Sequence, residues 1–498
     1  MKDELQKLIR HAAVYGFGRI VGRAGSFFLI PVYTHYFSAS DYGAMEILSL
    51  AAMVAGILLA LGLPTSLMRF YYANDDPQER GRTVSTVLLF SLALGGSIAG
   101  LVILNASTIS RMLLGSEGQA VLVRLVAVTF FFSYFSDLAW VYLRAKQRSG
   151  LYVFLTQASL IGAIILNLYF VAVRKIGVVG AFWGNAIATA TIGMILLFLT
   201  LREVGLRFSP SRLGTMLRFG APLTLIWVAA FALNYSDRFF LQRFTSLAEV
   251  GVYALAYKFG YVLSLMVIQP FQLIWEPQSY EIAKRDNAKE IFPRLFVLYS
   301  IALTTVAFLV ALFIREVFEV FVNARFQFGA RMVPLIVYAY VVQGMGLFFE
   351  AGLLIRKKSR TIAAIGVVST LFCLACNAVL IFALGAWGAC LSTLISFGVL
   401  SAATYFYSQR CYPFHCDFSG VGKVIALSVL VLFAAWMLPV ESFAPRMVYK
   451  LALAAVFLFG VFKLRVLQPE EASALKELVE AGCRKIGWSS LGVAVPRN

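Results

Sequence analysis

Two arginines four positions apart stand inside the first long apolar stretch of the chain. Arg19 and Arg23 belong to the segment GFGRIVGRAG, within a mostly apolar run over 11–36. In a helix these positions share one face and lie about 6 Å apart along the axis. A charge in the middle of a membrane span costs about 2.5–3.5 kcal/mol on insertion scales, so such a group faces protein or water. Because a guanidinium binds phosphate oxygens in pairs and keeps its charge, the pair predicts a site for a phosphate-bearing anion.

Three further cations are candidates for the same anion. Lys258 lies near mid-depth of a predicted span, where a charge again indicates function. Arg238 stands next to Asp237 near a span end, and consecutive helical residues point about 100° apart, so the two need not pair with each other. For Arg238 a structural ion pair fits as well as substrate contact, and for Arg69 contact with phospholipid head groups is an alternative. The predicted substrate-binding residues are Arg19, Arg23, Lys258, Arg238 and Arg69.

Four acids inside predicted spans are candidates for coupling transport to an ion. These are Glu46, Asp137, Asp237 and Glu350, each within a turn or two of a span end, and the sequence does not select one of them. We find no nucleotide-binding loop of the form GxxxxGK[ST], which favours an H⁺ or Na⁺ gradient or the membrane potential as the energy source. We expect no cofactor. We also predict no metal site, because the CYPFHC segment (411–416) offers three ligands where structural zinc takes four.

The elements that position these charges are membrane helices. Of 498 residues, 60% are hydrophobic and 14% charged, and the mean hydropathy is +0.81, values typical of an integral membrane protein. A spanning helix needs roughly 20 mostly apolar residues. The short connections leave no room for a soluble catalytic domain. Fourteen predicted spans cover residues 11–36, 43–71, 83–107, 119–143, 150–173, 176–201, 217–242, 249–276, 293–315, 332–355, 360–383, 386–408, 421–440 and 446–465.

The net charge of +18 is mostly a topology signal and does not indicate nucleic-acid binding. With fourteen spans both termini share one side of the membrane, and the loops on that side hold 19 Lys and Arg against eight on the other. The positive-inside rule therefore predicts cytoplasmic termini. The tail at 467–498 contains apolar residues at helical spacing and is predicted to form an amphipathic helix on the inner membrane surface.

The chain repeats itself after 208 residues. The triplet Asp41-Tyr42-Gly43 matches Glu249-Val250-Gly251, and Gly180-Ala181 matches Gly388-Ala389, with a two-residue slip at the preceding Asn. Six spans per copy make the two copies parallel, related by an axis along the membrane normal. The predicted fold class is thus an all-α integral membrane protein of about 14 transmembrane helices, with two six-helix bundles plus two extra C-terminal helices. The predicted divisions are an N-lobe at 1–201, a C-lobe at 202–410, spans 13–14 at 411–466 and the tail at 467–498.

The stretches PVYTHYFSASDYG, LGLPTSLMRFYY and DRFFLQRFTSLAEVGVYALAYK resemble the polysaccharide transporter (Wzx-like) family of the multidrug/oligosaccharidyl-lipid/polysaccharide exporter superfamily. The resemblance covers roughly residues 8–410. It implies a flippase that moves an undecaprenyl-pyrophosphate-linked oligosaccharide repeat unit across the bacterial inner membrane for surface polysaccharide biosynthesis. It also implies alternating access, a basic central cavity for the head group, and a lipid-tail groove at the two extra helices. The implied partners are the lipid-linked substrate, membrane lipids, and a polymerase or other polysaccharide-assembly proteins; we expect a functional monomer.

Two other classes of function stay open. A multidrug or cation exporter of the same superfamily shares the twelve-span repeat, but it would want an unpaired acid in a deep pocket, whereas the deepest charges here are basic. A membrane-embedded polysaccharide polymerase or glycosyltransferase would need carboxylates or metal ligands on a sizeable aqueous loop, and the sequence offers none. We therefore expect a transporter and no enzyme. A passive channel is disfavoured, because two parallel repeats are typical of transporters.

Overall fold

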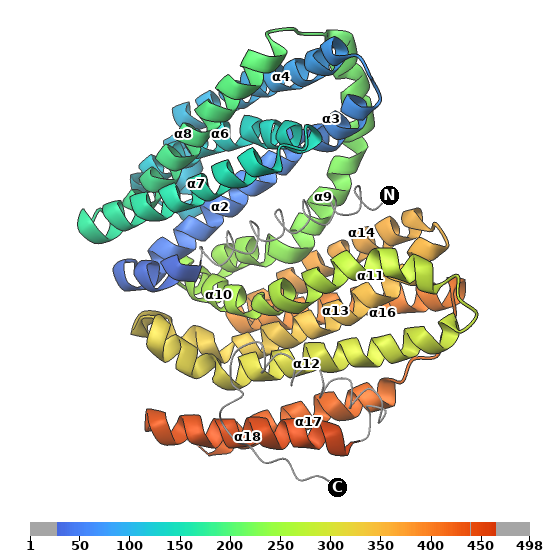
Figure 1. The fold of residues 1–498 in the computed structure, drawn as a ribbon. Coiled ribbons are helices and arrows are strands. Elements are labelled where there is room, and N and C mark those ends of the chain that lie inside the picture. The colour runs from blue at the N-terminus through green and yellow to red at the C-terminus, as the bar shows by residue number, and fades with distance from the viewer. Residues whose placement is uncertain (1–26, 439, 465–498) are drawn as a thin grey trace, which may run out of the picture. The chain divides into compact units, whose positions relative to one another are not determined.

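The computed structural model describes residues 27–438 and 440–464, and within these ranges the regular structure is entirely helical (Figure 1). Thirteen of the described helices are long and apolar enough to cross a membrane. They confirm the predicted spans from the second to the fourteenth. Of the first predicted span only 27–36 is described, and it is helical; Arg19, Arg23 and the tail at 467–498 lie outside the described residues.

The helices run in chain order with short connections. In the first half they are α2 (Ala39–Ala60), α3 (Leu63–Tyr72), α4 (Pro77–Leu104), α5 (Ala106–Leu114), η1 (Glu117–Gln119), α6 (Ala120–Ala145), α7 (Ser149–Asn167), η2 (Leu168–Val173) and α8 (Val178–Val204). In the second half they are α9 (Pro210–Phe244), α10 (Leu247–Gly260), η3 (Ser264–Ile268), α11 (Gln269–Ile282), α12 (Ala288–Phe321), η4 (Ala324–Arg331), α13 (Val333–Ile355), α14 (Ser359–Cys376), η5 (Asn377–Ile381), α15 (Phe382–Leu384), α16 (Ala386–Cys411), α17 (Phe418–Met437) and α18 (Phe443–Lys463).

The chain forms two compact units, and several helices contribute to both. Unit 1 contains the residues up to Phe259, Val317–Ile336 and Ala363–Val399. Unit 2 contains Gly260–Glu316, Val337–Ile362 and the residues from Leu400 onwards. These units are defined by compactness and not by the repeat, so the lobe boundaries predicted at 201 and 410 stay a prediction.

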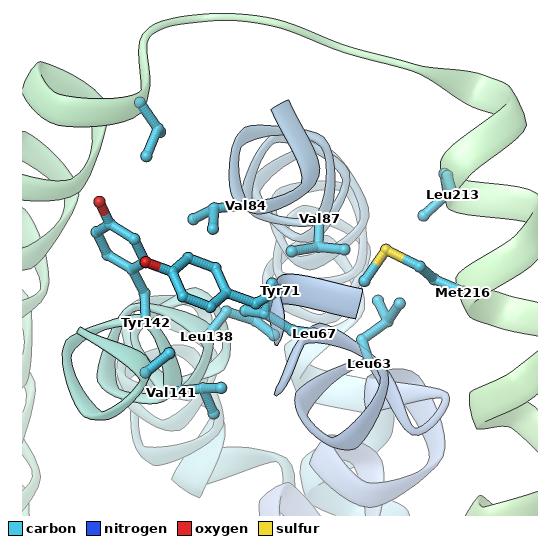
Figure 2. Close-up of a cluster of buried hydrophobic side chains, with 12 residues drawn as sticks. Leu63, Leu67, Tyr71, Val84, Val87, Leu138, Val141, Tyr142, Leu213 and Met216 are labelled. Carbon is cyan, nitrogen blue, oxygen red and sulfur yellow. The ribbon is translucent and has the colours of Figure 1, made fainter. Parts of the chain in front are cut away.

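Unit 1 is built around α6, which packs against α4 and α8, while α7 covers α8 and α3 packs against α4, α6 and α9. A cluster of buried side chains joins these helices, and Figure 2 shows it. Tyr71 of α3 and Tyr142 of α6 meet edge to face with ring centroids 6.1 Å apart, and Met216 of α9 closes the cluster. Elsewhere Gly95 of α4 and Gly193 of α8 pack directly against α6 side chains. Such small residues permit close helix packing in a membrane.

The second predicted span, 43–71, is not one continuous helix. It breaks at Leu61 and Gly62, both of which have positive φ, and α3 starts afresh with Pro64 in its first turn. Gly62 also packs on the backbone of Gly220, where an added Cβ would lie 2.1 Å from the carbonyl oxygen. Both the positive φ and the close approach require glycine. The apolar pattern alone predicts one helix because it does not register this backbone contact.

The predicted repeat recurs in matching details of the structure. The fifth and eleventh spans each end in a π-helical segment next to a buried asparagine, Asn167 before η2 and Asn377 at the start of η5. The matching glycines pack on these segments: an added Cβ at Gly180 would meet Phe170, and one at Gly388 would meet Leu380. The two glycines match at the repeat shift, but the residues that they contact are offset by two further positions. This offset is the two-residue slip that the sequence shows at the asparagine.

Unit 2 is packed mainly through aromatic side chains. Phe271 stacks on Tyr299 at 3.7 Å between ring centroids, and Trp275 stacks on Phe348 at 4.3 Å. The indole N–H of Trp275 donates a hydrogen bond to the Phe348 carbonyl at 3.3 Å. The two C-terminal helices α17 and α18 pack against each other. A stacked pair, Phe308 and Phe457, joins α18 to α12 at 4.1 Å.

Candidate functional site

The candidate site lies where α2 and α10, matching helices of the two repeats, meet inside unit 1. Each helix starts with a serine cap at the same position of the repeat. Ser38 accepts a hydrogen bond from the Asp41 amide at 3.1 Å, and Ser246 accepts one from the Glu249 amide at 3.2 Å. Asp41 bonds back to the Ser38 amide at 3.0 Å and completes a capping box. The SASDYG and SLAEVG stretches that match in sequence are thus paired helix starts.

Glu249 uses its carboxylate differently from Asp41, its counterpart in the first repeat. Its Oε1 accepts a hydrogen bond from the backbone amide of Ala386 at 2.7 Å, at the first residue of α16. An acid at a helix N-terminus is stabilised by the unpaired amides and the helix dipole there. The second acid of the repeat therefore anchors α10 to α16.

α2 and α10 cross at a pair of glycines. An added Cβ on Gly43 would lie 1.8 Å from the carbonyl oxygen of Leu247, and one on Gly251 would lie 2.0 Å from that of Ala39. Gly251 is the repeat counterpart of Gly43, and Leu247 is that of Ala39. The contact is therefore reciprocal, as in a two-fold interface, in which residue i meets j and j meets i. Only glycine allows the two backbones to come this close.

This crossing brings a lysine and an acid together within the membrane spans. The Lys258 ammonium donates a hydrogen bond to the Tyr42 hydroxyl at 3.0 Å and lies 3.4 Å from Oε2 of Glu46. Its nitrogen is 4.8 Å from the centre of the Tyr42 ring. Tyr42 and Glu46 are one turn apart and share a face of α2, whereas Lys258 lies two turns beyond Gly251 on α10. We call these three residues the Lys258 cluster.

The Lys258 cluster is partly exposed. The Lys258 side chain is 40% exposed and that of Glu46 is 13% exposed. An ammonium that already contacts a tyrosine hydroxyl is a suitable donor for a phosphate or other anion. Of the predicted substrate-binding residues that the structure describes, Lys258 has the geometry best suited to this role.

Arg238 belongs to a closed cluster in the same unit. Its Nη1 lies 2.6 Å from Oδ1 of Asp237, so the two consecutive residues do pair, and its guanidinium stacks on the Tyr257 ring at 3.8 Å. The Tyr253 hydroxyl donates to Oδ2 of Asp237 at 2.5 Å. The side chains of Arg238 and Asp237 are 2% and 6% exposed. In this conformation the pair is structural, and the predicted substrate and coupling roles of the two residues stay predictions.

The other predicted residues lie apart from the Lys258 cluster. Arg69 on α3 is exposed and stacks on the Phe219 ring of α9 at 4.2 Å. Asp137 lines a small cavity of about 30 Å³ beside the break between α2 and α3, together with Tyr134. Glu350 lies in unit 2 on α13 and is half-buried. Their predicted roles stay predictions. In the ranges that the structure describes, two candidate coupling acids contact candidate substrate-binding residues: Glu46 contacts Lys258, and Asp237 contacts Arg238.

The sequence reasoning missed a buried charge cluster in unit 2. Glu316 of α12 lies 2.8 Å from Nε of Arg446 and 2.8 Å from Nζ of Lys450, both on α18. Lys450 also donates to the Leu312 carbonyl at 2.6 Å, and all three charged residues are less than 9% exposed. α18 begins at Phe443, so both cations lie within this helix. The signal available in the sequence was two cations at i and i+4, which put both charges on one helix face.

The CYPFHC loop between α16 and α17 is held by hydrogen bonds. Gln409 donates to the Phe414 carbonyl at 2.9 Å and accepts from the Phe414 amide at 3.0 Å. Burial raises the pKa of the Cys416 thiol to about 12. A protonated thiol is a poor metal ligand. Among the described residues we find no group of three or more His, Cys, Asp or Glu side chains placed to hold a metal ion.

Comparison with known proteins bears directly on this site. The model of the family described as "Polysaccharide biosynthesis protein" matches residues 8–283, more than half of the chain and the part that contains the Lys258 cluster. The chain belongs to this family. This confirms the polysaccharide-family resemblance drawn from stretches such as PVYTHYFSASDYG.

One relative and two kinds of solved structure add detail. The EPS I polysaccharide export inner membrane protein EpsE of Ralstonia nicotianae is 25% identical over 157 residues, which are 31% of this chain and 36% of EpsE. The lipid II flippase MurJ, in an inward closed conformation, superposes with a TM-score of 0.72 at 12% identity, covering 91% of this chain and 99% of MurJ. An inward-facing multidrug resistance transporter of the MATE family gives 0.64 at 16% identity, covering 77% and 93%. Such identities show a shared fold: the chain is a multi-pass membrane protein with the fold of these two structures.

Proposed function

We propose that this protein is a flippase that moves an undecaprenyl-pyrophosphate-linked oligosaccharide across the bacterial inner membrane by alternating access. Support comes from the family, from the polysaccharide-export relative, and from a fold shared with a lipid II flippase. The observation that carries the proposal is the partly exposed Lys258 side chain within the spans. It sits where matching helices of the two repeats cross, so motion between the repeats would change what surrounds it.

Lys258 suits the anionic part of such a substrate. A charged residue inside a membrane span is retained where it meets an ion, a partner or water. Lys258 contacts the Glu46 carboxylate and the Tyr42 hydroxyl, and its side chain is partly exposed. The adjoining Tyr42 ring and hydroxyl add a cation–π contact and a hydrogen bond. Arg19 and Arg23, outside the described residues, are proposed to bind the same pyrophosphate. We propose an H⁺ or Na⁺ gradient, or the membrane potential, as the energy source, and both termini in the cytoplasm.

The test is flipping by purified variants in vesicles. Lys258→Glu places a negative charge where the substrate's anion should bind, so we expect it to abolish flipping of a fluorescent prenyl-pyrophosphate-linked sugar, while Lys258→Arg keeps partial activity. The matched control is Lys289→Glu, the same charge reversal at an exposed position of α12. Flipping by the Lys258→Glu protein at the control rate, with equal protein in the vesicles, would refute the assignment of Lys258.

A multidrug or cation exporter is the second candidate, because the fold is shared with a MATE transporter and Glu46 supplies an acid at the site. Such an exporter binds cations, so its affinity should fall when Glu46 is neutralised and survive the loss of Lys258. Uptake of a cationic dye into vesicles separates the two proposals. Dye transport that needs Glu46 and tolerates Lys258→Gln would favour the exporter.

A further inference from the structure

The Lys258 ammonium already has an anion in this structure, and that anion is a side chain of the protein. Glu46 lies 3.4 Å away, farther than the roughly 2.7–2.9 Å of a strong charge-assisted hydrogen bond. Within the described part of the chain, Tyr42 and Glu46 account for two of the three N–H donors of the ammonium. The pair therefore neutralises Lys258 without enclosing it.

The neighbouring pair in unit 1 shows what an enclosed arrangement looks like. Asp237 and Arg238 are 2.6 Å apart, almost completely buried, and covered by tyrosine rings. Lys258 has one hydrogen bond of 3.0 Å to Tyr42 and one ion pair of 3.4 Å to Glu46, with 40% of its side chain exposed. Breaking the first pair would leave an uncompensated buried charge, whereas an incoming anion that replaced Glu46 would leave Lys258 paired throughout.

Glu46 and Lys258 are not repeated, whereas the scaffold that brings them together is. The serine caps and the crossing glycines occur in both copies at the same positions. The counterpart of Glu46 is Ala254, and the counterpart of Lys258 is Leu50, both apolar. The caps and glycines that form the crossing are thus common to both repeats, whereas the acid and the base on its two helices each occur in one repeat.

We infer that Glu46 is an internal counter-anion that the substrate's pyrophosphate displaces from Lys258. The inference rests on the proposed function and assigns a role to a second residue of the same site. Without substrate, Glu46 keeps Lys258 charged and neutralised within the membrane. A pyrophosphate-bearing lipid outcompetes the single carboxylate because it offers more negative charge and more acceptor oxygens. Because Glu46 competes for Lys258, it lowers the net affinity for the anion, and once the anion has left it pairs with Lys258 again and competes with rebinding. A neutral or cationic head group gains nothing by entering.

The experiment is a double-mutant cycle in binding to the full chain, in nanodiscs of phosphatidylcholine. The probe is geranylgeranyl pyrophosphate, with geranylgeraniol as the uncharged comparison, and the readout is the dissociation constant. Glu46→Gln removes the competing charge while keeping the side-chain shape, so we expect about tenfold tighter binding of the pyrophosphate and no change for the alcohol. Glu117→Gln, which neutralises an exposed acid on η1, is the control for general electrostatics and should leave both values unchanged.

The second arm of the cycle removes the lysine. Lys258→Gln should weaken pyrophosphate binding at least tenfold. In that background Glu46→Gln should not change the dissociation constant, because there is no longer a lysine for which Glu46 and the pyrophosphate compete. In flipping assays Glu46→Gln should be slower than the native protein although it binds more tightly, because the side chain at position 46 no longer competes with rebinding. A structural role for Glu46 predicts neither the dependence on Lys258 nor tighter binding joined to slower transport.

The outcomes separate the inference from the function on which it rests. If neither the native protein nor any variant binds the pyrophosphate more tightly than the alcohol, the proposed function fails. If the native protein binds it but Glu46→Gln does not bind more tightly, or its gain persists without Lys258, the counter-anion role is overturned. Should Glu46→Gln not be stable, Glu46→Asp weakens the same contact by shortening the side chain. Binding by that variant no tighter than by the native protein would overturn the role equally.

Discussion

The glycine crossing of α2 and α10 makes a sharp quantitative prediction. Substituting Gly43 by Ala places a methyl group 1.8 Å from the Leu247 carbonyl oxygen, and Gly251→Ala places one 2.0 Å from that of Ala39. A carbon and a carbonyl oxygen in close contact normally lie about 3.3–3.6 Å apart, so the helices must separate by roughly 1.5 Å. Both obstacles are backbone atoms, which no side-chain rotation can move.

The energetic cost follows from this overlap. Overpacking of well-packed sites costs typically about 1–3 kcal/mol, which corresponds to a roughly 5–150-fold shift away from the conformation described here. Intrinsic helix propensity acts in the opposite direction, because alanine stabilises a helix by about 1 kcal/mol relative to glycine. Any loss of this conformation therefore reports the crossing itself. The double substitution should cost less than the sum of the single ones, since one separation relieves both contacts.

The assay is a distance measurement between spin labels at positions 40 and 248, which are repeat counterparts in the first turns of α2 and α10, in a cysteine-free background. We expect Gly43→Ala and Gly251→Ala each to add a population at longer distance and to slow flipping. The control is Gly162→Ala on α7, where an added Cβ has nothing within 4 Å. If both substitutions left the distance distribution and the transport rate equal to those of the control, the crossing would not be the close contact described here.

Three further predictions concern other parts of the chain. Glu316→Gln removes a buried carboxylate that lies against both Arg446 and Lys450, so we expect a loss of about 3–5 kcal/mol and a lower melting temperature in a detergent thermal-shift assay; a melting temperature equal to that of the exposed control Glu290→Gln would contradict this. Reporters fused after Asn498 and within 284–290 should both be cytoplasmic, because the loops on that side hold 19 of the loop Lys and Arg against eight; a periplasmic signal from either would refute the topology. Cysteines at positions 19 and 23, in a background without the native cysteines, should react with a membrane-impermeant thiol reagent and be protected by lipid-linked substrate, and Arg19→Ala and Arg23→Ala should each impair export more than Phe28→Ala; inert cysteines with normal export by both variants would remove these arginines from the proposed site.

The sequence by itself determined what depends on local pattern and on comparison of the chain with itself. Apolar length predicts the spans, and the shift of 208 residues predicts which helix starts and glycines correspond. Lys258 could be singled out because inserting a charged base at mid-depth of the membrane costs free energy whichever way its side chain points. These inferences need only helix periodicity, the thickness of a membrane and the insertion cost of a charge.

Partner choice was decided by the tertiary structure. The distances from Lys258 to Glu46 and from Glu316 to Lys450 depend on how two helices remote in sequence cross, and no local pattern encodes that angle. The tertiary structure also leaves the Lys258 side chain partly exposed, whereas Arg238, which the sequence likewise predicts to bind substrate, is buried against tyrosine rings. The glycines at 43 and 251 mark the crossing in the sequence, but only packed backbones show that they touch each other.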